Sequence, residues 1–198
     1  KNPHLNPSLV LALSSDPHIA VLAAAAENPI LSSGKLVELA NHRSYIVRTE
    51  VAKNPSTPLS NLEKLGQDSE WGVRRGVALN PASSQGLLKI LSTDSISEVQ
   101  IAVAGNAKTE MAVLEQLWSG EAKTRSTIIE NPACTEVFLK SAYEAALLPE
   151  EEQAETYDDD FRGDTTTRSA IAKRSDLSHA FLTLLVQDPS NYVRRDLA

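Results

Sequence analysis

Residues 54–79 read NPSTPLSNLEKLGQDSEWGVRRGVAL, and the Asn-Pro pair that opens this stretch returns at Asn80-Pro81. A fixed period of this size is typical of stacked repeat proteins. The repeated asparagine recurs every 26 residues, as Asn2, Asn28, Asn54, Asn80 and Asn106. We therefore expect an array of about seven repeats, near residues 2–27, 28–53, 54–79, 80–105, 106–130, 131–173 and 174–198.

Two sets of apolar positions within the repeat predict two short helices. Leu62 and Leu65 lie three residues apart, which is typical of the buried face of a helix. Val73, Val77 and Ala78 form a second set with helical spacing. Helices of about ten residues are unstable alone, so each repeat has to bury its apolar faces against its neighbours. No stretch alternates with period two, which argues against a sheet.

The polar residues of the repeat predict how the helices begin. Proline at a first helical position loses no hydrogen bond, so we expect Asn-Pro to start the first helix or a short 3₁₀ turn before it. We expect Asp68, or the serine after it, to cap the second helix. The asparagine side chains are predicted to form a ladder along the array, through Asn28, Asn54, Asn80, Asn106 and Asn131.

The later repeats depart from the pattern. Ala107 stands where proline is expected, and Arg174 takes the place of an asparagine. The sixth repeat contains an acidic insertion, residues 149–164, whose eight acidic residues and one arginine equal the chain's whole net charge of −7. We expect a solvated loop, with a docking segment for a basic partner as the alternative. The carboxylates of the insertion do not fit a calcium-binding loop, so no metal is expected.

The repeat resembles that of the leucine-rich repeat variant family. The resemblance rests on residues 54–79 and on residues 47–55 (VRTEVAKNP), and it covers nearly all of the chain outside the insertion. It implies an all-α protein, a right-handed α-solenoid, that acts as a binding scaffold and not as a catalyst. Some relatives carry a cysteine-rich iron–sulfur segment. Because Cys134 is the single cysteine here, such a cluster is excluded and no cofactor is expected.

An arginine column follows the start of the second helices, and it has two interpretations. A row of guanidinium groups can hold phosphates, which would make this surface a nucleic-acid site. We favour a structural role, in which Arg74 pairs with Asp68 and Arg194 pairs with Asp188, six residues earlier in each repeat. The column consists of Arg48, Arg74, Arg125, Arg168 and Arg194.

Aromatic residues fall in two further columns. Tyr45 and Trp71 share one, and Trp118 and Tyr143 share another that holds small residues in earlier repeats. The second column either fills a widening gap or builds a contact surface. Tyrosine, tryptophan and arginine commonly anchor protein interfaces. The candidate contacts for a partner are therefore Tyr45, Trp71, Arg75, Trp118, Tyr143 and Arg195.

Signals for catalysis and for metal binding are missing from the sequence. The four histidines occupy different repeat positions, and there is no glycine-rich phosphate loop or nucleophile elbow. No run of 18 apolar residues predicts a membrane span. The single cysteine favours a reducing compartment, so we expect a cytoplasmic protein. Because both ends fall on repeat boundaries, we also expect a piece of a longer array.

We therefore expect a scaffold that binds a protein or peptide on the concave face of its superhelix. Nucleic-acid binding through the arginine row is the alternative.

Overall fold

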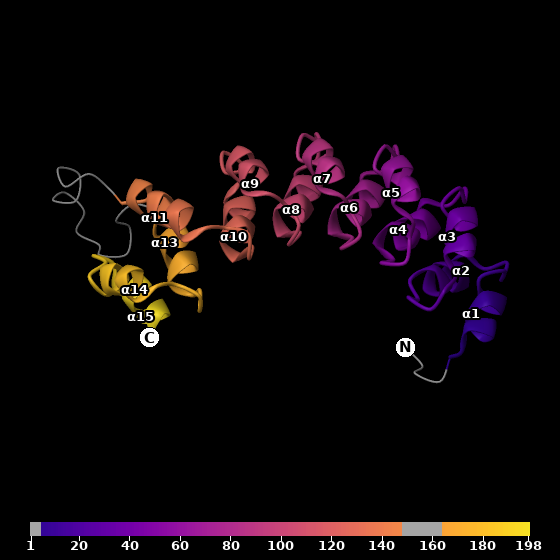
Figure 1. The fold of residues 1–198 in the computed structure, drawn as a ribbon, viewed down its shortest axis with the longest axis horizontal. Helices are drawn as coiled ribbons and strands as arrows, with labels where there is room; N and C mark the ends of the chain where they lie inside the picture. The colour runs from indigo at the N-terminus through magenta and orange to yellow at the C-terminus, as the bar shows by residue number, and fades with distance from the viewer. Residues whose placement is uncertain (1–4, 148–163) are drawn as a thin grey trace. The chain divides into compact units, whose positions relative to one another are not determined.

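The structure is a computed structural model that describes residues 5–147 and 164–198. These residues form helices and no strand, which confirms the predicted all-α class. Of the acidic insertion at 149–164, only Asp164 lies within the described residues. Figure 1 labels the helices: α1 (Pro7–Leu13), α2 (Ile19–Ala26), α3 (Ser33–Leu39), α4 (Tyr45–Lys53), α5 (Leu59–Leu65), α6 (Trp71–Leu79), α7 (Gln85–Leu91), α8 (Ser97–Gly105), α9 (Met111–Leu117), α10 (Ala122–Glu130), α11 (Glu136–Ala145), α13 (Thr165–Ala172), α14 (His179–Val186) and α15 (Asn191–Leu197).

The helices form two compact units, Lys1–Val113 and Leu114–Ala198, with the boundary inside α9. In the first unit, α1, α3, α5 and α7 are the first helices of the repeats, and α2, α4, α6 and α8 are the second helices. Each second helix packs against the next, α2 on α4, α4 on α6 and α6 on α8. Figure 1 shows α4, α6 and α8 in one row, and α5 and α7 in another.

The predicted apolar columns form the core of the first unit. Leu62 and Leu65 of α5 are buried, and so are Val73, Val77 and Ala78 of α6. Small residues let the second helices approach closely. A Cβ placed on Gly76 would lie 3.0 Å from the Ala52 Cβ of the preceding second helix.

The Asn-Pro pairs end the second helices instead of beginning the first ones, which corrects the expectation. Asn54 and Asn80 are the C-caps of α4 and α6, in extended conformation. The residue before a proline is disfavoured in helical conformation, so Pro55 and Pro81 stop the helix there. A turn follows, and the next helix starts four or five residues later, after Pro58 or Ser84.

In the second unit, α13 packs against α10, α11 and α15, and α15 also packs against α14. Its core contains Ile128 of α10, Leu139 of α11, Ile171 of α13, Leu185 of α14 and Val193 of α15, all at most 1% exposed.

Candidate functional site

The repeated asparagines join each repeat to the one before it. The buried Asn80 amide donates to the carbonyl oxygens of Ala52, at 2.7 Å, and Asn54, at 2.8 Å. Its side-chain oxygen accepts the backbone N–H of Ala82 at 2.8 Å. The last carbonyls of a helix have no partner within that helix, so Asn80 caps α4 from the following repeat. Asn54 and Asn106 make the same three contacts.

The ladder also tolerates a change of residue type. Arg174, which replaces the asparagine, donates through Nη1 to the carbonyls of Ile129 and Asn131. These carbonyls hold the same repeat positions as those that the Asn80 amide contacts. At Asn28 and Asn131, the side-chain oxygen accepts the N–H two residues later, at 3.0 and 2.8 Å. Asn2 lies outside the described residues.

Sequence reasoning missed a second capping column, three residues after each asparagine. Thr57, Ser83 and Thr109 are buried, and each hydroxyl donates to a carbonyl in the last turn of the preceding helix at 2.6 Å. The signal was present, because three successive repeats carry Thr, Ser and Thr there. Cys134 occupies the same position in the sixth repeat. It is 4% exposed, and burial raises the pKa of its thiol to about 11.

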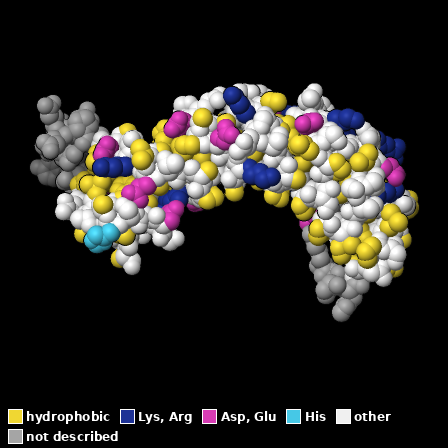
Figure 2. Space-filling view, viewed as in Figure 1, with side chains coloured by type: hydrophobic (Ala, Val, Ile, Leu, Met, Phe, Trp, Pro, Cys, Tyr) yellow, Lys and Arg dark blue, Asp and Glu magenta, His cyan; other side chains and the backbone are white. Residues whose placement is uncertain are grey.

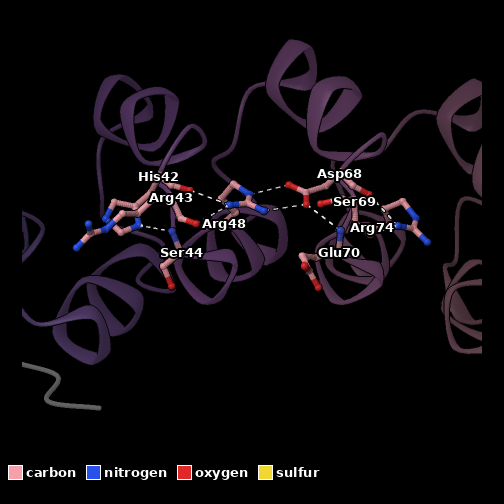
Figure 3. Close-up of polar contacts among 8 residues, drawn as sticks. All are labelled: His42, Arg43, Ser44, Arg48, Asp68, Ser69, Glu70 and Arg74. Carbon is pink, nitrogen blue, oxygen red and sulfur yellow. Dashed lines mark hydrogen bonds and ion pairs between the residues drawn. The ribbon is translucent and has the colours of Figure 1, made fainter.

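The arginine column joins neighbouring repeats by ion pairs, as Figure 3 shows for Arg48. The Arg48 guanidinium donates to both Asp68 carboxylate oxygens, from Nε at 2.6 Å and from Nη2 at 2.9 Å. Its Nη1 donates to the carbonyls of His42 and Arg43 in its own repeat. Arg74 binds the Asp94 carboxylate with the same geometry.

The predicted partners of Arg74 and Arg194 were therefore wrong. Arg74 contacts only the backbone carbonyl of Asp68, and its carboxylate partner is 20 residues later in the next repeat. Arg194 likewise donates to the Asp188 carbonyl. The Asp188 carboxylate pairs instead with Arg168, at 3.0 Å. The helix carries the arginine side chain past its own repeat, so spacing within one repeat does not reveal the partner.

These contacts hold the aspartates in their ionised form. Arg74 lowers the pKa of Asp94 below its ordinary value of 3.8. Burial alone would raise the pKa of Asp68, but hydrogen bonds from Arg48 and from the Glu70 backbone outweigh it and lower that pKa.

The aspartates do not cap the second helices as expected. Asp68 and Asp94 accept the backbone N–H of the residue two positions later, Glu70 and Ile96, at 3.0 Å. These residues are the N-caps of α6 and α8, and no side chain caps either helix. Each aspartate therefore closes a local turn and presents its oxygens to the arginine of the preceding repeat.

The two members of the ion pair change together along the sequence. Where Leu22 replaces the arginine, His42 replaces the aspartate 20 residues later, and where Gln100 replaces it, Gly120 follows. Gln100 keeps the other half of the contact, because its amide donates to the Asp94 carbonyl at 2.7 Å.

The second unit buries its ion pair completely. Arg168 and Asp188 both have 0% of their side chains exposed. Burial, together with a hydrogen bond to Asp188, raises the pKa of Tyr143. Arg125 donates to the Gly120 carbonyl at 3.0 Å and lies 3.8 Å from the carboxylate of Asp164.

The predicted contact residues separate into exposed and buried groups. Tyr45 is 52% exposed and Trp71 is 45% exposed, at the first positions of α4 and α6. Ile19, 38% exposed, holds the same position in α2. We call these three residues the second-helix stripe. Sequence reasoning missed Ile19, although its position in the column was visible.

Tyr143 is 2% exposed, so its prediction as a partner contact was wrong. Its ring packs edge to face against Phe181, with centroids 6.0 Å apart. Trp118 is partly buried and packs against Phe138 in the same way, at 5.0 Å. This aromatic column fills space between successive repeats.

Arg75 is exposed on α6, and Arg195 is exposed on α15. The Arg195 guanidinium lies 5.0 Å from the centre of the Tyr192 ring and 3.1 Å from the Asp196 carboxylate. These residues line an open groove of about 850 Å³ in the second unit, over α10, α13 and α15. Lys173 and Asp196 form a further ion pair in the groove, at 3.2 Å.

Two absences apply to the described residues. Residues 5–147 and 164–198 contain no group of three or more His, Cys, Asp or Glu side chains placed to hold a metal ion. Within the same ranges, every helix is too short or too polar to cross a membrane.

Comparison with known proteins yields no match, either to the models of protein families or to curated proteins.

Proposed function

We propose that this chain is a non-catalytic scaffold that binds a protein or peptide, built as a right-handed superhelix of about seven repeats of the leucine-rich repeat variant type. The second-helix stripe carries the proposal, because it places one exposed apolar side chain on each of three successive, directly packed helices. Apolar side chains clustered with an aromatic pair are typical of interface anchors. The single buried thiol fits a reducing compartment such as the cytoplasm.

The stripe belongs to the helices that would form the concave face. Gly76 and Ala52 bring α6 close to α4, since a Cβ on Gly76 would meet Ala52 at 3.0 Å. A row of helices that approach closely is shorter than the row behind it, so a stack curves toward the closer row. In the second unit, the groove also lies over second helices.

The spacing of the stripe favours an extended peptide. Packed helices lie about 8–10 Å apart. Three residues of polyproline II span about 9 Å. A peptide with an apolar residue at every third position would therefore place one side chain against each of Ile19, Tyr45 and Trp71.

The arginine row gives the nucleic-acid alternative little support. The guanidinium groups of Arg48, Arg74 and Arg168 already bind carboxylates of the next repeat. Phosphate binding would have to break these pairs and leave aspartates uncompensated.

A random peptide library displayed on phage, selected on the full chain, tests the proposal. We expect enriched peptides to carry apolar residues three apart. Their affinity should fall about tenfold or more for the double variant Tyr45→Ala/Trp71→Ala, because hot-spot aromatics contribute most of the binding energy.

The matched control is Leu59→Ala/Ile90→Ala, which removes exposed apolar side chains from first helices, 42% and 65% exposed. Equal losses in both double variants, or no enrichment at all, would contradict the proposal. Binding to labelled DNA that weakens steeply with added salt would favour the alternative.

A further inference from the structure

Two kinds of side-chain contact recur between successive repeats. The first joins the position that ends the first helix to a position near the start of the next first helix. It is seen as Trp118 on Phe138 and as Tyr143 on Phe181. Where the first member is Gly66, the contact is so close that a Cβ there would lie 2.9 Å from Leu87.

The second contact is the ion pair between an arginine and the aspartate 20 residues later. Arg48 and Asp68, Arg74 and Asp94, and Arg168 and Asp188 are its three instances. Both contacts are directional, because each repeat supplies one member to the repeat before it and the other member to the repeat after it.

The N-terminal repeat presents the receiving member of both contacts without a preceding repeat. Leu9, in the position of Leu87 and Phe138, is 49% exposed. Asp16, in the position of Asp68, accepts only from its own neighbour His18 among the described residues. Between them lies an apolar groove of about 340 Å³, lined by residues that include Leu13 and Val21. Figure 2 shows hydrophobic side chains gathered over this end, around α1 and α2.

The C-terminal repeat presents the donating member of both contacts. Val186, in the position of Gly66 and Tyr143, is 60% exposed. Arg194, in the position of Arg48, uses Nη1 on the carbonyls of Asp188 and Pro189. Within the described part of the chain, no carboxylate lies within 4.0 Å of its guanidinium.

The geometry points to a second copy of this chain as the occupant of the N-terminal face: the C-terminal repeat of one copy stacks on the N-terminal repeat of the next. In this contact Val186 of one copy meets Leu9 of the other, and Arg194 pairs with Asp16. Both matches continue the interface that joins the internal repeats. The two joined surfaces differ, so the contact is head to tail and leaves a free face at each end for further copies.

Sedimentation velocity of the full chain, over about three decades of concentration, tests this inference. We expect the average mass to rise with concentration and to pass that of a dimer. Asp16→Arg and Arg194→Asp should each weaken association about tenfold or more, because each places like charges together. The double variant Asp16→Arg/Arg194→Asp exchanges the two charges and should restore association to within about threefold of the original.

Leu9→Glu should also weaken association, whereas Val137→Glu should not, since Val137 is 79% exposed away from both end faces. Circular dichroism checks that each variant folds. If either reversal impairs folding, Asp16→Asn and Arg194→Gln remove the pair without repulsion, and each should still weaken association.

Three results would overturn the inference: a monomer at every concentration, a double variant that is not rescued, or association that Leu9→Glu abolishes and Arg194→Asp leaves unchanged. The last result would mean that two N-terminal faces meet each other.

Discussion

Replacing Asn80 with alanine removes one rung of the asparagine ladder at the centre of the first unit. The side chain is fully buried, and it donates to the carbonyls of Ala52 and Asn54 and accepts the N–H of Ala82. Alanine can make none of these bonds. The backbone groups would stay buried, because α4 and α6 remain packed around them.

The three groups are not affected equally, and this sets the magnitude. The Asn54 carbonyl keeps the N–H of Thr57 as a donor at 3.0 Å, and Ala82 is only partly buried. The Ala52 carbonyl is the group that loses its cap. A buried polar group without a partner costs about 1–3 kcal/mol, and a lost hydrogen bond about 1 kcal/mol. We therefore expect Asn80→Ala to lower the free energy of unfolding by about 2–4 kcal/mol.

Thermal unfolding followed by circular dichroism measures this loss. For a chain of this length, about 1 kcal/mol shifts Tm by about 2–4 °C, so Tm should fall by at least about 4 °C. The matched control is Asn41→Ala, an exposed asparagine that bonds only to Val37 within its own helix. It should stay within about 0.5 kcal/mol of the original protein.

Amide hydrogen exchange locates the effect, because stability in a repeat array is a sum of neighbour terms. Exchange should accelerate in α4 and α6 more than in α14 and α15. An Asn80→Ala protein that melts with the Asn41→Ala control would refute the ladder as a source of stability.

Three further predictions concern the ion pairs and the buried thiol. A double-mutant cycle between Arg74→Ala and Asp94→Ala should give a coupling energy of about 1–2 kcal/mol in urea unfolding, and a value near zero would show that the pair adds nothing. Because the folded-state pKa of Asp94 lies below its unfolded value, its contribution is present above about pH 4 and is lost as the pH falls through the folded pKa. Asp94→Asn should therefore flatten the decline in stability below about pH 4, whereas the exposed Glu63→Gln should leave it unchanged. Cys134, with its pKa raised to about 11, should react with iodoacetamide at pH 8 at least about tenfold more slowly in the folded protein than in urea, as mass spectrometry can measure.

The sequence was sufficient for the features that repeat. The period of 26 residues located the columns of Leu62 and Val73, and these columns form the core. It also singled out the asparagines, although their Pro55-type neighbours end a helix where a start was expected. Periodicity identifies which positions are equivalent, but it does not say which end of a helix a proline restricts.

Contacts between repeats could not be derived in the same way. The carboxylate partner of Arg74 lies in the next repeat, and a single copy of the unit offers Asp68 as an equally good candidate. Tyr143 and Trp71 are both aromatic, yet one is buried and the other exposed. The difference depends on Phe181, which faces Tyr143 from the following repeat. Side-chain direction, and not spacing, decides these cases.

Paired measurements on Tyr45→Ala/Trp71→Ala test most directly the division between residues that hold the repeats together and residues that bind. We predict that this double variant keeps the Tm of the original protein within about 2 °C, since both side chains are about half exposed, and that it loses about tenfold or more in affinity for a library-selected peptide. A variant that binds the peptide with unchanged affinity would contradict the account, and so would one that loses affinity only because it unfolds.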